Sequence, residues 1–241
     1  MKKGDEFLTE VSHRPWEKPT TNWQYYQEWE DVLFLHFEVD HADLRFLVPD
    51  HLSLDSYSGK YYISLVAFKM KNLRPAGLPS VGFISDFYEI QTRTYVIKNG
   101  KRGVYFINLE VAKKISAFVA KVLSGLPYEK SDITRSATAY NNINNHKGYF
   151  LDVTFSTENQ IDIKKDFDTW LTERYALFLY KNNALRVFEI HHEPLALHHV
   201  HVEKLNIHYQ IRNLKIESYT LIACHYVPGI QMVSWSPVAV E

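Results

Sequence analysis

The segment FYEIQTRTYVIKNGKRGVYFINLE, residues 87–110, is the part of the chain that most narrows its fold. Asn99-Gly100 divides it into two runs rich in β-branched and aromatic residues. Asn-Gly suits the two-residue type I′ turn, in which both central residues take a positive φ angle. The segment therefore predicts an antiparallel β-hairpin of two long strands.

Strand alternation places several polar residues on one face of this hairpin. Counting back from the turn gives the expected pairs Lys98 with Lys101, Arg93 with Phe106, Gln91 with Asn108, and Glu89 with Glu110. Directly opposed carboxylates repel each other unless a proton, a cation or Arg93 lies between them. If the two glutamates are buried, the pKa of at least one carboxyl rises, which is a common arrangement in acid–base catalysis.

The same pattern has a simpler interpretation. An exposed hairpin face is normally polar, and Arg93 would then neutralise the two glutamates at the surface. Glu110 would also suit the first turn of a following helix, where the helix dipole favours a negative charge. A bulge near Gly103 would shift the register and separate the two carboxylates. Spacing alone leaves these interpretations open.

Further strands are expected on both sides of the hairpin. Strand-like runs cover residues 31–39, 61–70, 133–140 and 149–155, and most of residues 185–240. The run at 61–70 is almost continuously apolar, as expected for a strand that is covered on both faces.

Two helices and one short helical turn are also predicted. Apolar residues at helical spacing from Ile115 to Leu123 predict an amphipathic helix, which Gly125 and Pro127 would end. A second helix is expected to open at Asp168 and to run to Asn182-Asn183, with Leu171, Tyr175, Phe178 and Leu179 as its apolar face. Asp40 is expected to cap the short turn that follows the first strand.

Many strands, two helices and short links predict an α+β fold with an antiparallel sheet curled into a β-barrel. Aromatic residues make up 15% of the chain and favour sheet. No repeat or Gly/Ser-rich linker marks a boundary, so residues 1–241 are expected to form one domain. Residues 1–23, which contain Pro15 and Pro19, are expected to form an irregular N-terminal arm.

Charge and cysteine content exclude some classes of protein. The net charge is −1 and no basic stripe is present, so nucleic acid is not an expected partner. Cys224 is the only cysteine, which rules out an intramolecular disulfide and a cysteine-rich zinc site. Because the start lacks a signal-peptide pattern and no apolar run is long enough to span a bilayer, a cytoplasmic location without membrane contact is expected.

Several short motifs occur in a particular order along the chain. They are HRPW, WEDVLFLHFEVD, FYEIQTRTYV, GVYFINLE, SGLPY, LTERY and EIHH. This order resembles the YqjF-like family, uncharacterised bacterial proteins of the acetoacetate decarboxylase-like superfamily, from His13 to about Pro237. The resemblance implies a β-barrel with a central cavity and flanking helices. The polar face of the hairpin would then line the cavity.

The turn after the first predicted helix departs from the decarboxylase pattern. The decarboxylases carry Gly-x-Pro-Lys there, and the lysine forms a Schiff base with the keto acid. In this chain Tyr128 follows Pro127, and a phenol cannot form an iminium. The resemblance therefore implies an acetoacetate decarboxylase-like protein without that mechanism. Lys130 is a weaker candidate for the missing amine because it lies two residues further along, and a solvated role is expected for it; Lys113 and Lys114 are expected to be surface charges.

The candidate site combines the hairpin with this turn. Glu89 and Arg93 are the candidate catalytic residues, as acid or base and as the group that orients a carboxylate or carbonyl oxygen. The expected ligand-binding residues are Glu110, Asn108, Gln91 and Tyr128. The expected ligand is a small organic acid or carbonyl compound, with no cofactor. Whether a reaction follows stays open, since a non-catalytic ligand-binding or sensing barrel fits the same residues, and a structural subunit of a homo-oligomer is a third alternative.

Two further groups of residues carry weaker signals. His191, His192, His198, His199 and His201 lie in one stretch, but no carboxylate has a ligand spacing, so no metal is expected. The helical motif from Thr172 to Tyr175 is part of the resemblance, and one of its residues is expected to reach the mouth of the cavity.

Overall fold

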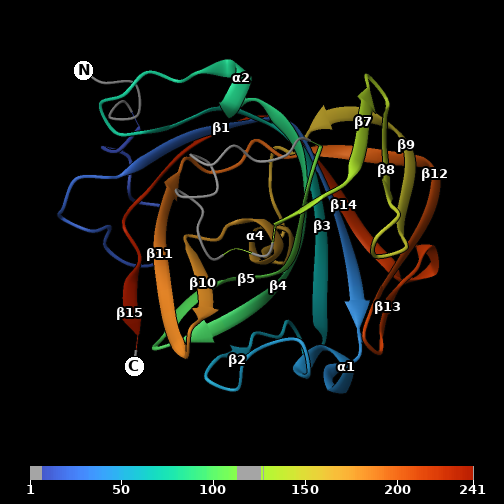
Figure 1. Ribbon diagram of the computed structural model, residues 1–241, viewed down its shortest axis with the longest axis horizontal. Helices are drawn as coiled ribbons and strands as arrows, with labels where there is room; N and C mark the ends of the chain where they lie inside the picture. Colours follow the sequence, from blue (N-terminus) through green and yellow to red (C-terminus); the bar gives the residue numbers. More distant parts are fainter. Residues whose placement is uncertain (1–6, 113–125, 127, 241) are drawn as a thin grey trace.

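The computed structural model describes residues 7–112, 126 and 128–240, and most of this part of the chain is β-strand (Figure 1). The strands are β1 (Tyr25–Val39), β2 (Ser53–Leu54), β3 (Tyr61–Pro75), β4 (Phe87–Lys98), β5 (Lys101–Val111), β6 (Tyr128–Lys130), β7 (Asp132–Ser136), β8 (Ala139–Asn144), β9 (Tyr149–Gln160), β10 (Ala176–Lys181), β11 (Ala184–His192), β12 (His198–Ile211), β13 (Leu214–Ile216), β14 (Leu221–Ser234) and β15 (Val238–Val240). The helices are α1 (His41–Arg45), α2 (Gly82–Ser85), α4 (Asp166–Thr172) and the 3₁₀ turn η1 (Ser218–Thr220).

The strands form one curled sheet whose main path is β15-β11-β10-β5-β4-β3-β1-β14-β12-β9-β8-β7. A short ladder from Ile190↔Ser234 to His192↔Met232 also joins β11 to β14. This ladder links β11, β10, β5, β4, β3, β1 and β14 into an uneven ring rather than a regular antiparallel barrel. The unevenness is clearest at β10 and β5, which run parallel and pair only at Leu177↔Val104 and Phe178↔Tyr105.

The ring of strands surrounds α4 (Figure 1). Side chains of the ring also line a cavity. The backbone carbonyl of Leu171 on α4 accepts a hydrogen bond from Tyr95 on β4. Asp168, also on α4, lies 3.2 Å from His225 on β14. α4 is therefore attached to two strands of the ring, and its C-terminal residues Trp170, Leu171 and Thr172 are buried there, whereas Asp166 and Thr169 are exposed.

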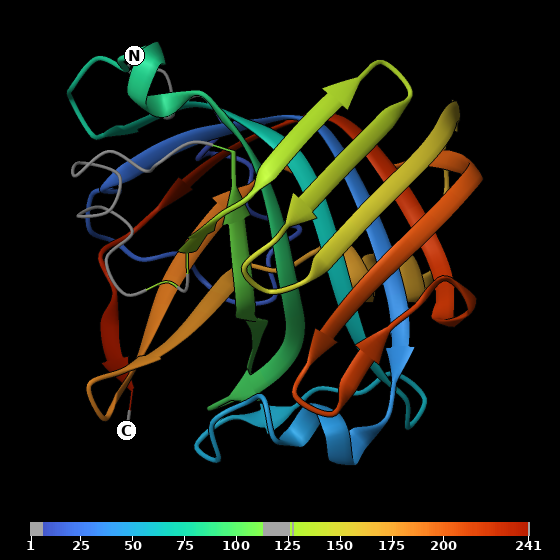
Figure 2. The same cartoon turned by 45° about the vertical axis from the view of Figure 1, so that its right-hand side comes forward.

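The outer face of β1, β3 and β4 is covered by the remaining strands. β12, β9, β8 and β7 continue the sheet beyond β14 and lie across this face (Figure 2). The largest apolar core fills the space between the two layers, with Leu35, Leu65 and Ile90 from one side and Leu151 and Ile207 from the other. The near-continuous apolar run of β3 is thereby explained, since this strand is covered on both faces.

The β4–β5 hairpin has the predicted turn. Asn99 and Gly100 have φ angles of 51° and 75°, and Lys98 pairs with Lys101. The predicted pairing of Arg93 with Phe106 is also confirmed.

Beyond Phe106 the predicted hairpin register is wrong. Ile107 is an extra residue on β5, and this bulge moves every later pair by one position. The observed pairs are Thr92 with Asn108, Gln91 with Leu109, Ile90 with Glu110 and Glu89 with Val111. The bulge lies at Ile107 rather than near Gly103.

The second predicted helix is too long. It ends at Thr172, and residues 176–181 form β10, whose hairpin with β11 turns at Asn182-Asn183. Both asparagines have positive φ angles, 52° and 58°, as a type I′ turn requires. The four residues from Ala176 to Leu179 are all buried, and an apolar run covered on both faces satisfies helical and strand patterns equally.

Other sequence predictions have mixed outcomes. Asp40 caps α1 as expected, since its carboxylate accepts a hydrogen bond of 2.7 Å from the backbone of Ala42. The strand predicted at 133–140 is instead the hairpin β7–β8. Before β1, the described residues 7–24 contain no helix or strand. The helix predicted from Ile115 to Leu123 lies outside the described residues.

No helix in the described ranges is both long and apolar enough to cross a membrane.

Candidate functional site

A cavity lies inside the ring, bounded by β1, β3, β4, β5, β6, β10, β11, β14 and the segment that follows α4. The space open to the centre of a water molecule is about 90 Å³, and one water needs roughly 10–15 Å³ on that measure. Most of the wall is apolar and includes Trp29, Phe34, Met70, Leu177, Phe188 and Met232. The size and the wall suit a small organic molecule with a few polar groups.

Glu89 and Gln91 point into this cavity from β4. The Glu89 side chain is buried, and its Oε1 accepts a hydrogen bond of 2.8 Å from Gln91 Nε2. Glu89 Oε2 and Gln91 Oε1 have no hydrogen-bond partner in the described part of the chain. Burial raises the pKa of Glu89 to about 8, because removing the carboxylate from water disfavours its charged form. Glu89 therefore holds a proton at neutral pH.

Arg93 lies two residues further along the same face of β4 and also lines the cavity. It is 5% exposed, and its guanidinium lies 5.4 Å from the centre of the Phe34 ring. Its Nε and Nη2 have no hydrogen-bond partner among the described residues, where no carboxylate forms an ion pair with it. Burial lowers the pKa of Arg93, but a guanidinium starts from so high a value that it stays charged. Buried charges in proteins are normally paired, so the free N–H groups of Arg93 could accommodate an anion.

The second arginine of the cavity wall is different. Arg174 donates a hydrogen bond of 2.7 Å to Asp55, and both side chains are almost fully buried. This ion pair neutralises Arg174, so that Arg93 is left as the cation available to a ligand.

Tyr128 reaches the cavity from β6. This strand runs parallel to β5 and pairs Tyr128 with Leu109, which in turn pairs with Gln91. Burial, and then the charge of Glu89, raise the pKa of Tyr128 well above its usual value. The phenol is therefore a neutral hydrogen-bond donor. Lys130 is exposed and does not line the cavity.

Asn108 and Glu110 were expected on the same face, and the structure corrects this. The bulge at Ile107 turns them to the outer side of the ring, away from Glu89. Both are buried, and Glu110 accepts hydrogen bonds from Asn142, Asn144 and Tyr209 on β8 and β12. Glu110 thus joins the two layers of the protein.

Several polar residues near the cavity have no role among the sequence predictions. Thr172, Arg174 and His192 line the cavity, whereas the motif LTERY predicts only that one of its residues reaches the cavity mouth. A buried chain of side chains lies beside Arg93: Asp168 contacts His225, His225 contacts His36, His36 contacts Ser64, and Ser64 contacts Tyr95. The available signal was a polar residue inside an apolar run, as in His36 within VLFLHFEV and Ser64 within YYISLVAF.

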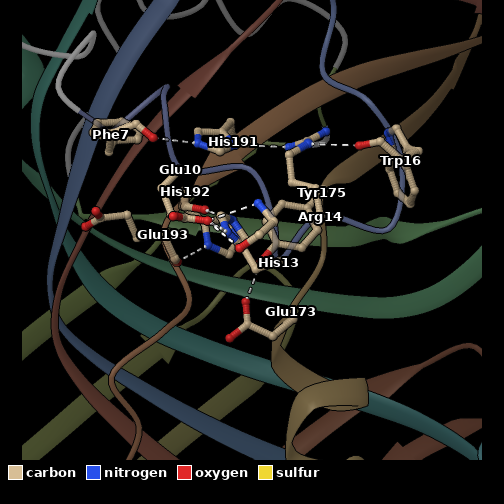
Figure 3. Close-up of polar contacts among 11 residues, drawn as sticks. Phe7, Glu10, His13, Arg14, Trp16, Glu173, Tyr175, His191, His192 and Glu193 are labelled. Atoms are coloured by element: carbon tan, nitrogen blue, oxygen red, sulfur yellow. Dashed lines mark hydrogen bonds and ion pairs between the residues drawn. The ribbon is translucent and has the colours of Figure 1, made fainter.

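The N-terminal arm packs against β11 beside this cavity. His13 Nε2 lies 2.9 Å from the carbonyl oxygen of His192, and Arg14 donates to the carbonyl of Ile190. Figure 3 shows Phe7, His191, Arg14 and Trp16 linked in one row. Residues of the HRPW motif therefore contact the carbonyl oxygens of Ile190 and His192, which lie beyond the last β10–β11 pair, Ala176 with Glu189.

The histidine-rich stretch is divided between two strands. His191 and His192 are buried in β11, whereas His198, His199 and His201 belong to β12. Within the described ranges, no group of three or more histidine, cysteine, aspartate or glutamate side chains could hold a metal ion.

Comparisons with known proteins agree with the family expected from the motifs. The sequence profile of DUF2071, described as an uncharacterized conserved protein, matches residues 26–231. The uncharacterized protein YqjF of Bacillus subtilis (strain 168) is 34% identical over 197 residues, which cover 77% of this chain and 79% of that protein.

Solved structures show where the fold recurs. The enduracididine biosynthesis enzyme MppR, complexed with pyruvate, matches with a TM-score of 0.61 at 10% identity over 93% of each chain. Acetoacetate decarboxylase from Legionella pneumophila matches with a TM-score of 0.61 at 12% identity, covering 98% of this chain and 95% of that one. At such low identity these matches establish the fold alone.

Proposed function

The chain belongs to the DUF2071 family, and from its geometry we propose that it binds a small organic acid or carbonyl compound in the cavity beside Arg93. The observation that carries this proposal is the guanidinium of Arg93, which is 5% exposed, lines the cavity and has no carboxylate partner among the described residues, where its Nε and Nη2 also lack a hydrogen-bond partner. Its two free N–H groups suit the two oxygens of a carboxylate. The mostly apolar wall around the buried guanidinium lowers the local dielectric constant, which strengthens such an interaction.

The neighbouring polar groups have complementary roles. Glu89 is protonated at neutral pH, and it can donate a proton or a hydrogen bond to an oxygen of the ligand. Tyr128 donates a second hydrogen bond from β6. The similar fold of MppR was solved with pyruvate, a small keto acid, and this supports a ligand of that size.

Decarboxylation through a Schiff base is not part of the proposal. Tyr128 follows Pro127 where the decarboxylases carry their lysine, and a phenol cannot condense with a ketone. Treatment with borohydride and acetoacetate is expected to leave the mass of the protein unchanged. A trapped adduct would contradict this part of the proposal.

Binding is tested by thermal shift against a library of small acids, ketones and aldehydes. Carboxylates are expected to raise the melting temperature of the wild-type protein and not that of Arg93→Gln. Arg186→Gln is the matched control, because Arg186 is exposed on β11, and it should respond like the wild type. A library without any stabilising acid or carbonyl compound would overturn the proposal.

The same ligand then separates an enzyme from a sensor. Turnover that is lost in Glu89→Gln while binding is retained identifies an enzyme that uses Glu89 as acid or base. Binding without any product identifies a non-catalytic binding protein.

A further inference from the structure

The cavity carries two groups of opposite character on one strand face. Arg93 and Glu89 are four residues apart on β4, about 14 Å between their Cα atoms at a rise of ~3.4 Å per residue. They form no ion pair with each other, and Gln91 lies between them. Each group is nevertheless buried and lines the same cavity.

The Arg93 end offers donors only. Its Nε and Nη2 lack partners, and both belong to the planar fork that binds a carboxylate with two hydrogen bonds. The nearby Arg174 is already paired with Asp55, and both ring nitrogens of His192 lie within hydrogen-bond distance of backbone carbonyls. One carboxylate is therefore sufficient to neutralise this end.

The Glu89 end offers acceptors once the carboxyl has given up its proton. Among the described residues, Glu89 Oε2 and Gln91 Oε1 both lack partners, and the two side chains are joined by the hydrogen bond from Gln91 Nε2 to Glu89 Oε1. An ammonium group has three donors and no acceptor, so it would satisfy both oxygens. A methyl group placed there would leave both oxygens buried and unpaired, which is costly.

We propose that the ligand is a small zwitterion, an amino acid whose carboxylate binds Arg93 and whose ammonium group, separated from it by a short apolar chain, binds Glu89 and Gln91. This inference rests on the proposed function, since it names the class of acid that the same cavity takes. Phe34 and Leu177 supply apolar wall for the connecting carbons. A cavity of about 90 Å³ corresponds to roughly six to nine waters at 10–15 Å³ each, which suits a chain of four to six carbons.

Proton release gives this binding a signature. Glu89 holds a proton in the empty cavity, because burial raises the pKa of its carboxyl to about 8. An ammonium group in contact with it would favour the ionised form, and the proton would leave for the solvent. Binding of the zwitterion at pH 7 should therefore release close to one proton, whereas an acid with an apolar end should release none.

The experiment compares isosteric pairs by titration calorimetry at pH 7 in buffers of different ionisation enthalpy. The pairs are 4-aminobutyrate with pentanoate, 5-aminopentanoate with hexanoate, and 6-aminohexanoate with heptanoate. At least one amino acid is expected to bind about tenfold more tightly than its partner, because a hydrogen bond to a charged group contributes roughly 1.5–3 kcal/mol. In Glu89→Gln this preference should fall below about threefold, and the proton release should disappear.

The outcomes separate this inference from the proposed function. Alkanoates that bind as tightly as every amino acid, with no proton release, would overturn the zwitterion and leave the proposed acid site standing. The absence of binding by all six compounds would overturn the zwitterion as well, and the wider library would then decide the proposed function alone. Melting curves of Glu89→Gln confirm that the variant is folded, and the wild-type comparison needs no variant at all.

Discussion

Glu89 and Glu110 belong to the same hairpin, but their side chains lie on opposite faces of it. The Glu89 carboxyl lines the cavity and, in the part of the chain that the structure describes, has Gln91 as its one hydrogen-bond partner. The Glu110 carboxyl lies between the two layers and accepts three hydrogen bonds from β8 and β12. Burial with few partners favours the protonated form of the Glu89 carboxyl. The Glu110 carboxyl instead holds the two layers together through its hydrogen bonds.

Replacement of Glu110 by glutamine should destabilise the protein. The amide has one acceptor oxygen instead of two, and its NH₂ group would face the Tyr209 hydroxyl and the amides of β8. The free energy of unfolding should fall by about 1–3 kcal/mol, the usual cost of an unsatisfied buried group. Urea denaturation of Glu110→Gln measures this. Glu203→Gln, on an exposed residue of β12, is the control and should differ from wild type by less than about 0.5 kcal/mol.

Glu89 should make the protein less stable at alkaline pH. The folded protein holds the Glu89 proton up to a pKa of about 8, whereas the unfolded chain releases it near 4.5. The folded state therefore binds more protons between these values, and the stabilising contribution present below pH 4.5 is lost as the pH rises through 8. Glu89→Gln should remove this dependence and exceed the wild type in stability by on the order of a few kcal/mol at pH 8. Denaturation at pH 5.5, 6.5, 7.5 and 8.5 checks it; parallel curves for the two proteins would contradict the raised pKa.

The two cavity arginines should respond to the same mutation in opposite directions. Arg174→Met removes the close partner of the buried Asp55 carboxylate and leaves it only the more distant, exposed Arg102 at 3.9 Å among the described residues, and the expected loss is about 3–5 kcal/mol. Arg93→Met removes a buried charge that has no carboxylate partner in the described part of the chain, and stability should rise by about 1–3 kcal/mol, the usual cost of burying an unpaired polar group. Denaturant midpoints of the two variants provide the measurement. A large loss in Arg93→Met would show that the guanidinium has a structural partner in the protein.

His36 should contribute to acid denaturation. Burial, and then the charges of His225 and Arg93, hold the pKa of His36 well below 6.5 in the folded protein. The unfolded chain takes up this proton near pH 6.5, so stability is lost as the pH falls below that value. Between pH 6.5 and 5, His36→Gln should lose less stability than the wild type. The difference should reach about 2 kcal/mol, because uptake of one proton changes the free energy of unfolding by about 1.4 kcal/mol per pH unit. His201→Gln, on an exposed residue of β12, should keep the wild-type slope, and an unchanged slope in His36→Gln would refute the assignment.

Local turn chemistry was the most informative part of the sequence. Asn99-Gly100 predicted the hairpin and its first pairs, because the turn fixes the backbone over a few residues. Asn182-Asn183 adopts the same kind of turn, although the sequence pattern predicts the end of the second helix there. The apolar run before it has no periodicity that distinguishes a fully buried strand from a helix.

The candidate site was predictable only in part. Alternation along β4 placed Glu89, Gln91 and Arg93 on one face, and this placement does not depend on the partner strand. Asn108 and Glu110 depended on the register across the hairpin, which one extra residue changes. The contacts of His36 with Ser64 and His225 join strands distant in the sequence, and no local pattern reveals them.

The bulge at Ile107 reverses the alternation of β5. On the turn side of it, Val104 and Phe106 face the cavity. Beyond it, residues of the same even numbering, Asn108 and Glu110, face the outer layer.

Because Ile107 is the extra residue, deleting it would leave a regular ladder in which Asn108 still pairs with Thr92 and Glu110 with Ile90. If Ile107 were instead kept and paired regularly, Asn108 would lie opposite Gln91 and Glu110 opposite Glu89, and two carboxylates would meet on the cavity face. The unpaired residue thus keeps the two acids apart.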